Sequence, residues 1–373
     1  MPPTALPHVH RAWLAALLLV IVATSGCLGG EARSEWAFDV TQLDTAYGAG
    51  ARGKGVVVAI IDTGVNVKHP ALDHLRDGKT DNGELIAFRD FIGGVDGVNK
   101  AFDKEGHGSH VIGIMSARGS SFGDKLVNGG VDLLGASPGV QLVVARVCGD
   151  ENCDATKIDD AIRWATQNGA DVIGLSLGGA QLPLLQGVLQ PEQGQVQEAI
   201  TAAINDAIDR GVVVVAAAGN EQDDGAEDVS FPASIPGVIA VGAVGKSLQV
   251  AAFSNHGDSQ ANRCTSGPLV AQGRCHPNQK PELVAPGVGI LSAWTSDAYV
   301  RADGTSQATP FVTSAVALLL EGKPPLASRG DVNQIKQVLM DTAKELGGQS
   351  TPHDDAAGYG LVQVQSALTA YTG

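Results

Sequence analysis

The sequence predicts an α/β fold, a three-layer, doubly wound and mostly parallel sheet with helices on both faces. Short runs rich in Val, Ile and Ala are continuously apolar instead of alternating, as parallel strands buried on both faces should be. Helical patterns separate several of these runs, and strand–helix alternation is typical of this architecture. The expected strands are residues 56–61, 141–147, 171–177, 212–218 and 238–244.

Two helices are predicted from capping residues and apolar periodicity. Residues 154–169 begin with Asp154, a good N-cap residue, and end at Gly169. Residues 196–211 also end in a glycine. Each helix precedes an expected strand, as a crossover connection requires.

Two polar stretches, residues 181–195 and 254–281, are expected to be surface loops. No linker-like segment divides residues 36–372, so we expect one domain over that range.

Composition excludes some function classes. The chain has 373 residues, of which 44% are hydrophobic, so it has enough apolar residues to form a large core. Its formal net charge of −15 argues against nucleic-acid binding, which needs clustered Lys and Arg. We therefore expect no nucleic-acid partner. We also expect the protein to be a monomer.

The N-terminus is typical of an export signal. Arg11 precedes an apolar run, residues 12–23, that is too short to span a bilayer as a helix. Small residues then lead to Cys27, as at a lipoprotein processing site. We expect a signal peptide over 1–27, lipidation of Cys27, a short linker over 28–35, and an extracellular or cell-envelope location. The alternative is an uncleaved short anchor.

Four further cysteines are expected to form disulfides in such an oxidising compartment. Four cysteines allow three pairings, of which the local ones close short loops and are favoured. Zinc binding is the weaker reading because neither local pair has the CxxC spacing. The favoured pairs are Cys148–Cys153 and Cys264–Cys275.

Four polar residues follow expected strands or begin expected helices, where an α/β sheet gathers functional groups at one edge. Asp62 follows the first strand, His107 lies between glycines before an apolar helix, Asn220 follows the fourth strand, and Ser306 begins a long apolar helix. Each alone has a structural explanation, as a turn or cap residue. Together they supply a nucleophile, a base, an orienting acid and an oxyanion donor.

The histidines His107 and His110 are three residues apart and could also form a metal pair. That alternative is weak, because no third ligand is evident nearby. His110 is expected to be structural.

The surroundings of Ser306 favour nucleophilic chemistry. A helix that begins near Thr305 places the Ser306 N–H among the unpaired donors of the first turn, where the helix dipole favours an anion. Pro310 lies four residues later and cannot donate to the Ser306 carbonyl, so the first turn should be loosened.

Three segments in this order, "VVVAIIDTGV", "HGSHVIGI" and "DGTSQATPFV", resemble the subtilisin-like serine proteases (subtilases, peptidase S8 type). The resemblance covers roughly residues 36–372. It implies an endopeptidase, of broad specificity, that cleaves polypeptides without a cofactor. Ser306 would attack the scissile carbonyl, His107 would carry the proton, Asp62 would orient His107, and Asn220 with the Ser306 N–H would form the oxyanion hole.

The resemblance also implies a cleft in which a peptide binds as an added strand. The expected substrate-binding residues are Ser176, Leu177, Gly178, Ala217 and Gly219. The sequence does not set the P1 preference, although Glu221 at the pocket rim would tolerate basic groups.

Some positions depart from the family pattern. Ser109 and Gln307 replace the usual Thr and Met near the chemistry. Ala71 replaces a common acidic calcium ligand. Although Asp73 is close by and Asn128 lies in an expected loop, we do not expect the usual calcium site. Structural calcium elsewhere stays open on so acidic a chain. The catalytic pattern begins around Trp36, so we expect no prodomain.

The rival hypothesis is a catalytically impaired binding protein on the same fold, which predicts loss of a catalytic residue. All four candidate residues are present. An esterase with the same triad is a further alternative.

Overall fold

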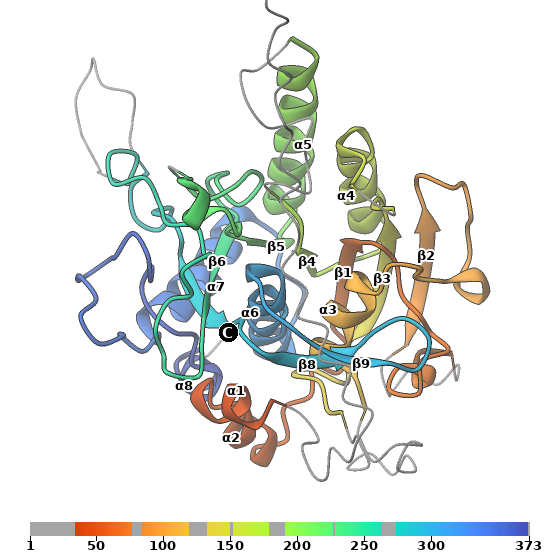
Figure 1. The fold of residues 1–373 in the computed structure, drawn as a ribbon, viewed down its shortest axis with the longest axis horizontal. Helices are drawn as coiled ribbons and strands as arrows, with labels where there is room; N and C mark the ends of the chain where they lie inside the picture. Colours follow the sequence, from red (N-terminus) through yellow and green to blue (C-terminus); the bar gives the residue numbers. More distant parts are fainter. Residues whose placement is uncertain are drawn as a thin grey trace, which may run out of the picture.

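Seven parallel strands form one sheet in the order β2-β3-β1-β4-β5-β6-β7 (Figure 1). The computed structural model describes residues 34–76, 84–118, 133–149, 152–178, 191–226, 228–262 and 274–371. The strands of the sheet are β1 (Val57–Asp62), β2 (Leu85–Asp90), β3 (Gln141–Arg146), β4 (Val172–Leu175), β5 (Val213–Ala217), β6 (Ile239–Val244) and β7 (Leu283–Pro286).

β1 lies inside the sheet and pairs with β3 on one side and β4 on the other. The chain therefore winds outward in two directions from β1, which is the doubly wound arrangement that the sequence predicts. The sheet register places Asp62 opposite Arg146 at the carboxyl end of β1. A functional site in such a sheet is expected beyond this edge.

Helices cover both faces of the sheet, and Figure 1 shows α3 and α6 on one side of the strands and α4 and α5 on the other. The three-layer prediction is confirmed. The helices are α1 (Glu35–Val40), α2 (Leu43–Gly48), α3 (His107–Ser116), α4 (Ile158–Gln167), α5 (Pro191–Asp209), α6 (Thr305–Leu320), α7 (Arg329–Asp341) and α8 (Val364–Ala370), with short 3₁₀ turns η1 (Asp73–Arg76), η3 (Val98–Lys100), η5 (Ala155–Lys157) and η8 (Gln222–Asp224).

All five predicted strands are present, shifted by a few residues at most. Every residue of β4, β5 and β6 is buried, which explains why these strands read as continuous apolar runs. Asp154 caps a 3₁₀ turn, accepting a hydrogen bond from Thr156 N, and α4 follows that turn. The capping prediction holds, although the α-helix itself begins four residues later.

Two features differ from the expectation. α5 begins at Pro191, so the end of the loop expected over 181–195 is helical. Proline is favoured in the first turn of a helix, because its missing N–H would have no partner there. The structure also has an antiparallel hairpin, β8 (Ile290–Ala293) and β9 (Tyr299–Ala302), which was not predicted from the sequence.

α6 is the central helix of the core. All of its 16 residues are buried, and it packs against β1, the strands β4 to β7, and α3. A helix that has no charged residue and is largely apolar is expected to lie inside the protein. Its position is therefore set by surrounding packing, and Ser306 at its start is held with it.

The fold already includes Ser34 and Glu35, at the end of the segment expected to be a linker. Ser34 is buried and its Oγ accepts a hydrogen bond from Leu291 N at 2.9 Å. None of the helices in the described ranges has the length and apolarity to cross a membrane.

Candidate active site

Asp62 and His107 form a close pair at the carboxyl edge of the sheet. Asp62 ends β1 and is 1% exposed, while His107 is the first residue of α3. The distance from His107 Nδ1 to Asp62 Oδ1 is 2.8 Å. Thr63 N also donates to Asp62 Oδ1, at 2.7 Å. A buried carboxylate is costly unless paired, and the imidazole is the pairing group here.

The environment of His107 favours its protonated form. Burial lowers the pKa of His107, but the charge of Asp62, its hydrogen bond and the charge of Asp103 outweigh this effect. The pKa therefore lies above the ordinary value of 6.5. An imidazole with a raised pKa is a stronger base, which suits a group that must remove a proton from a hydroxyl.

Ser306 lies in the first turn of α6 and forms two reciprocal hydrogen bonds with Ser176. Its Oγ donates to Ser176 O and its carbonyl accepts from Ser176 Oγ, each at 3.0 Å. Pro310 has no N–H for the Ser306 carbonyl, so the Ser176 hydroxyl takes the place of the missing helix donor. Ser176, directly after β4, thus replaces the helix hydrogen bond that the first turn of α6 was predicted to lack.

The Ser306 hydroxyl is directed at Ser176 and not at the imidazole. Within the described residues, no hydrogen bond joins Ser306 to His107. A rotation of the Ser306 side chain is needed before His107 can take its proton. Catalytic hydrogen bonds are often long or poorly aligned without substrate, so this geometry is compatible with catalysis.

Asn220 is held by its carbonyl oxygen. Its Oδ1 accepts hydrogen bonds from Thr305 N at 2.8 Å and from Thr305 Oγ1 at 2.9 Å. Because Oδ1 is directed at Thr305, which precedes Ser306, the Nδ2 amide is left as a donor beside the start of α6. This orientation suits a donor to an oxyanion that forms at Ser306.

The two expected cleft segments follow neighbouring parallel strands, since β4 pairs with β5 up to Leu175 and Ala216. Ser176, Leu177 and Ala217 are buried. The Leu177 side chain belongs to the core, so only its backbone is available to a peptide. A Cβ added to Gly178 would lie 3.1 Å from the Phe231 carbonyl, which shows how closely the chain passes there.

Comparison with known proteins identifies the family. A sequence profile described as the Subtilase family matches residues 53–360. The chain belongs to the subtilase family. It is 31% identical over 334 residues to subtilisin DY of Bacillus licheniformis, covering 89% of this chain and 97% of that protein. It is 32% identical over 286 residues to the major intracellular serine protease of Bacillus subtilis (strain 168), covering 75% and 73%. This subtilase is therefore a serine endopeptidase, and its family needs no cofactor for catalysis.

Several residues that support the site were not among the candidates predicted from the sequence. Thr63 and Asp103 bond to the turn that carries Asp62 and to the start of α3, and Thr305 holds Asn220. Asp103 lies four residues before His107, within "DKEGH". This spacing could have predicted the role, because a carboxylate just before a helix commonly accepts hydrogen bonds from the free N–H groups of the first turn.

Glu221, expected at the pocket rim, also has a structural role. Glu221 Oε2 accepts hydrogen bonds from Asn220 N, Ser230 Oγ and Asn255 Nδ2, at 2.9, 3.1 and 2.9 Å. The carboxylate therefore supports the backbone of Asn220 from within the fold. Tolerance of basic substrate groups by Glu221 stays a prediction.

His110 is structural, as expected. Its Nε2 lies 3.1 Å from both the Ile290 and Val300 carbonyls, so it joins α3 to the β8–β9 hairpin. Burial lowers its pKa to about 3, with the charge of His107 adding to this effect, so it is neutral at ordinary pH. The metal pair of His107 and His110 is wrong, because the two rings have different partners.

Cys148 and Cys153 form a disulfide, the local pairing that the sequence favours, which excludes zinc binding by this pair. Cys264 and Cys27 lie outside the described residues, as does Asn128. Across the described ranges, no group of three or more His, Cys, Asp or Glu side chains is arranged to hold a metal ion. The pairing of Cys264 with Cys275 stays a prediction.

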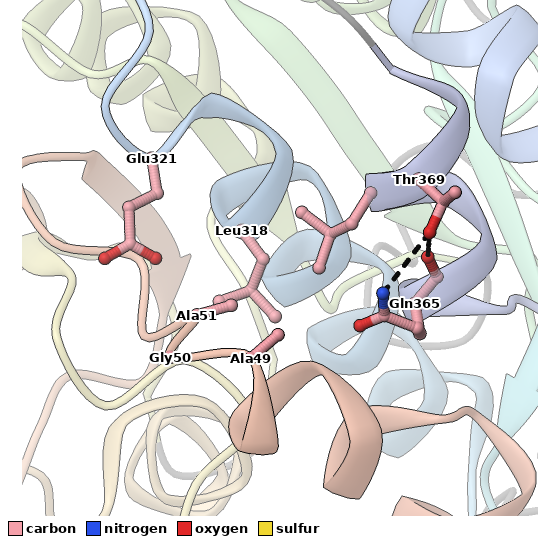
Figure 2. A pocket seen from close by; sticks show the side chains of 8 residues that line it. Ala49, Gly50, Ala51, Leu318, Glu321, Gln365 and Thr369 are labelled. Atoms are coloured by element: carbon pink, nitrogen blue, oxygen red, sulfur yellow. Dashed lines mark hydrogen bonds between the residues drawn. The ribbon is translucent and has the colours of Figure 1, made fainter.

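A separate hollow of about 340 Å³ lies at the other end of α6. Figure 2 shows Glu321 on one side of it and Gln365 and Thr369 on the other. Glu321 Oε2 accepts hydrogen bonds from Arg52 N and Gly53 N, which ties the carboxylate to the backbone. A 16-residue helix is about 24 Å long, so this hollow is no part of the Ser306 site.

Proposed function

We propose that this subtilase cleaves polypeptides through Ser306, His107 and Asp62, with an oxyanion hole formed by Asn220 Nδ2 and the Ser306 N–H. The observation that carries the proposal is the 2.8 Å contact between Asp62 and His107 at the sheet edge where α6 presents Ser306. Residues 176–178, which follow β4, would present backbone groups to the substrate as an added strand, and residues 217–219 would line the cleft.

In this mechanism the Ser306 hydroxyl turns from Ser176 O to His107 and attacks the scissile carbonyl. The proton passes to His107 Nε2, and the resulting imidazolium is stabilised by Asp62 on Nδ1. The carbonyl oxygen becomes an oxyanion between Asn220 Nδ2 and the Ser306 N–H, where the positive end of the α6 dipole adds to its stabilisation. His107 then protonates the leaving amine, and water repeats the sequence to release the acyl product.

We also propose that the protein is exported as a monomer and anchored through a lipid on Cys27. This proposal rests on the charged, apolar and small-residue pattern of residues 1–27. Incorporation of a labelled fatty acid by a bacterial host would test it, with Cys27→Ser as the control. Equal incorporation, or none, in both proteins would rule out the anchor.

The catalytic proposal is tested by a fluorophosphonate probe on the full chain, with adduct mapping by mass spectrometry. We expect stoichiometric labelling at Ser306 that is lost in Ser306→Ala and greatly slowed in His107→Ala. Ser314, a buried serine of the same helix, provides the matched control, because Ser314→Ala should label normally. Absence of labelling in the folded protein would favour the catalytically impaired binding protein instead.

A further inference from the structure

Asp103 is a second buried carboxylate near the catalytic pair, and the proposed mechanism does not use it. It is 9% exposed and lies in the loop before α3. Its Oδ1 accepts hydrogen bonds from Thr63 Oγ1, Glu105 N and Gly106 N at 3.0, 3.0 and 2.9 Å. Its Oδ2 accepts from Ser109 N and Ser109 Oγ at 2.8 and 2.7 Å. Every partner is a donor, so the site suits a carboxylate, which only accepts hydrogen bonds.

Two hydroxyl groups extend this network in the same way. Thr63 Oγ1 donates to Asp103 and accepts from Gly108 N at 2.8 Å. Ser109 Oγ donates to Asp103 and accepts from Asn66 N at 2.8 Å. Each hydroxyl therefore links the turn after β1 to the first turn of α3. The family's usual threonine is replaced at Ser109 without loss of this hydroxyl.

The network also caps the N-terminus of α3, the helix that carries His107. Gly106 is the N-cap and has no side chain with which to cap, so Asp103 and Thr63 receive the N–H groups of Ser109 and Gly108. The helix lies directly on the β1 turn, because a Cβ added to Gly108 would be 2.2 Å from the Gly64 carbonyl. A small displacement of either segment would change the Asp62–His107 distance.

We propose that Asp103 is a positioning residue for the proteolysis proposed above. Its carboxylate holds Thr63, which is adjacent to Asp62, and the first turn of α3 in the arrangement that sets the 2.8 Å contact between Asp62 and His107. The inference rests on the proposed function, since it assigns a task within the same catalytic pair. Misplacement by about 1 Å can cost about 10² in rate.

Asp103 also acts on His107 through its charge. The charged groups that raise the pKa of His107 are Asp62, at the end of β1, and Asp103, in the loop before α3. His110, on the same helix, is neutral. α6 and β8, which pack on α3, contain no titratable side chain. Removal of the Asp103 charge should therefore lower the pKa of His107.

Asp103→Asn in the full chain tests the inference, through kcat, KM and the pH dependence of kcat/KM on an uncharged peptide p-nitroanilide. We expect kcat to fall about 10- to 10²-fold with KM within about threefold. The acid limb should move to lower pH, because the Asp103 charge is one of the two that raise the pKa of His107. Asp354→Asn is the matched control, because Asp354 also organises a turn through backbone N–H groups. It should alter stability alone.

Two further variants retain the Asp103 charge, and they test its positioning role if Asp103→Asn fails to fold. Thr63→Val and Ser109→Ala should each lower kcat severalfold and leave the acid limb unchanged. Wild-type kcat in either folded variant, or a wild-type acid limb in folded Asp103→Asn, would overturn the positioning role. Failure of the wild-type protein itself to hydrolyse peptides or label at Ser306 would instead reject the proposed function.

Discussion

His107 can accept the Ser306 proton only when its imidazole is neutral, so the acid side of the activity profile reports its pKa. That pKa is raised above 6.5 because the Asp62 and Asp103 charges outweigh burial. We expect kcat/KM to be flat at alkaline pH and to fall tenfold per pH unit below a midpoint above 6.5. Rate measurements from pH 5 to 9 on an uncharged peptide substrate check this prediction.

Asp62→Asn is the variant that tests the origin of the midpoint. It removes the largest favourable charge on His107 and presents the wrong hydrogen-bonding group to Nδ1. We expect the acid limb to move to lower pH and kcat to fall about 10⁴-fold. A midpoint that stays in place after this substitution would assign the acid limb to another group.

Thr305 aligns the Asn220 side chain, and this role can be tested apart from the Asp62–His107 pair. Its hydroxyl donates to Asn220 Oδ1 and accepts from Gly219 N at 3.1 Å. Thr305→Val keeps the volume and removes both contacts, so the Asn220 amide should be less well aligned. We expect kcat to fall about tenfold with KM little changed. Thr309→Val provides the comparison, since among the described residues that hydroxyl bonds to Thr305 O within the helix and not to the Asn220 side chain. Equal losses in both variants would contradict this role.

At the scale of elements, the start of α6 depends on the end of β4. The Ser306 carbonyl lacks a helix donor because of Pro310 and accepts from Ser176 Oγ instead. Ser176→Ala leaves this buried carbonyl unpaired and should cost about 1–3 kcal/mol of unfolding free energy. Pro310→Ala restores an N–H, so the same substitution should cost much less in that background. Denaturant unfolding of the four proteins, all carrying Ser306→Ala to prevent self-digestion, measures the coupling.

An identical cost of Ser176→Ala in the two backgrounds would show that the Ser176 hydroxyl is not the substitute donor. The matched control is Ser292→Ala, which removes another buried hydroxyl that donates to a helix carbonyl, that of His110. Its cost should be independent of Pro310.

The elements that could be predicted are those whose own residues determine them. β5 and β6 are buried on both faces and read as apolar runs, and α6 begins at the expected Thr305. The start of α5 was missed because its first turn, "PEQGQ", has the composition of a loop. The catalytic candidates lie at predictable strand and helix ends. Asp103 was missed because its role appears only when the fold brings Thr63 and Ser109 to one carboxylate.

At the scale of the whole molecule, a buried charged cluster lies at the amino edge of the sheet, away from the proposed triad. Lys280 Nζ and Lys336 Nζ each lie 2.9 Å from Glu282 Oε1, and all three side chains are fully buried. The cluster joins α7 to β7 and, through the Val238 carbonyl, to the start of β6. Two lysines share one carboxylate, so the cluster carries an excess positive charge when both are protonated.

Burial lowers the pKa of Lys280 to about 7, with Lys336 and Arg274 adding to the effect and Glu282 opposing it. The unfolded lysine titrates near 10.5 and therefore holds more protons than the folded one between pH 7 and 10.5. Stability from this group should rise with pH across that window and be flat below it. Lys280→Met should remove the rise and add about 1–4 kcal/mol at pH 6, because Lys336 still pairs with Glu282.

Denaturant unfolding of the Ser306→Ala protein at pH 6 and pH 9.5, with and without Lys280→Met, measures this difference. Glu282→Gln is the opposing control, because it leaves both cations without their carboxylate and should cost about 3–5 kcal/mol at pH 6. If Lys280→Met destabilised the protein equally at both pH values, Lys280 would be a packing group whose charge has no net cost. The stability of the sheet edge would then depend on its contact with Val238 O and on its aliphatic stem, not on titration.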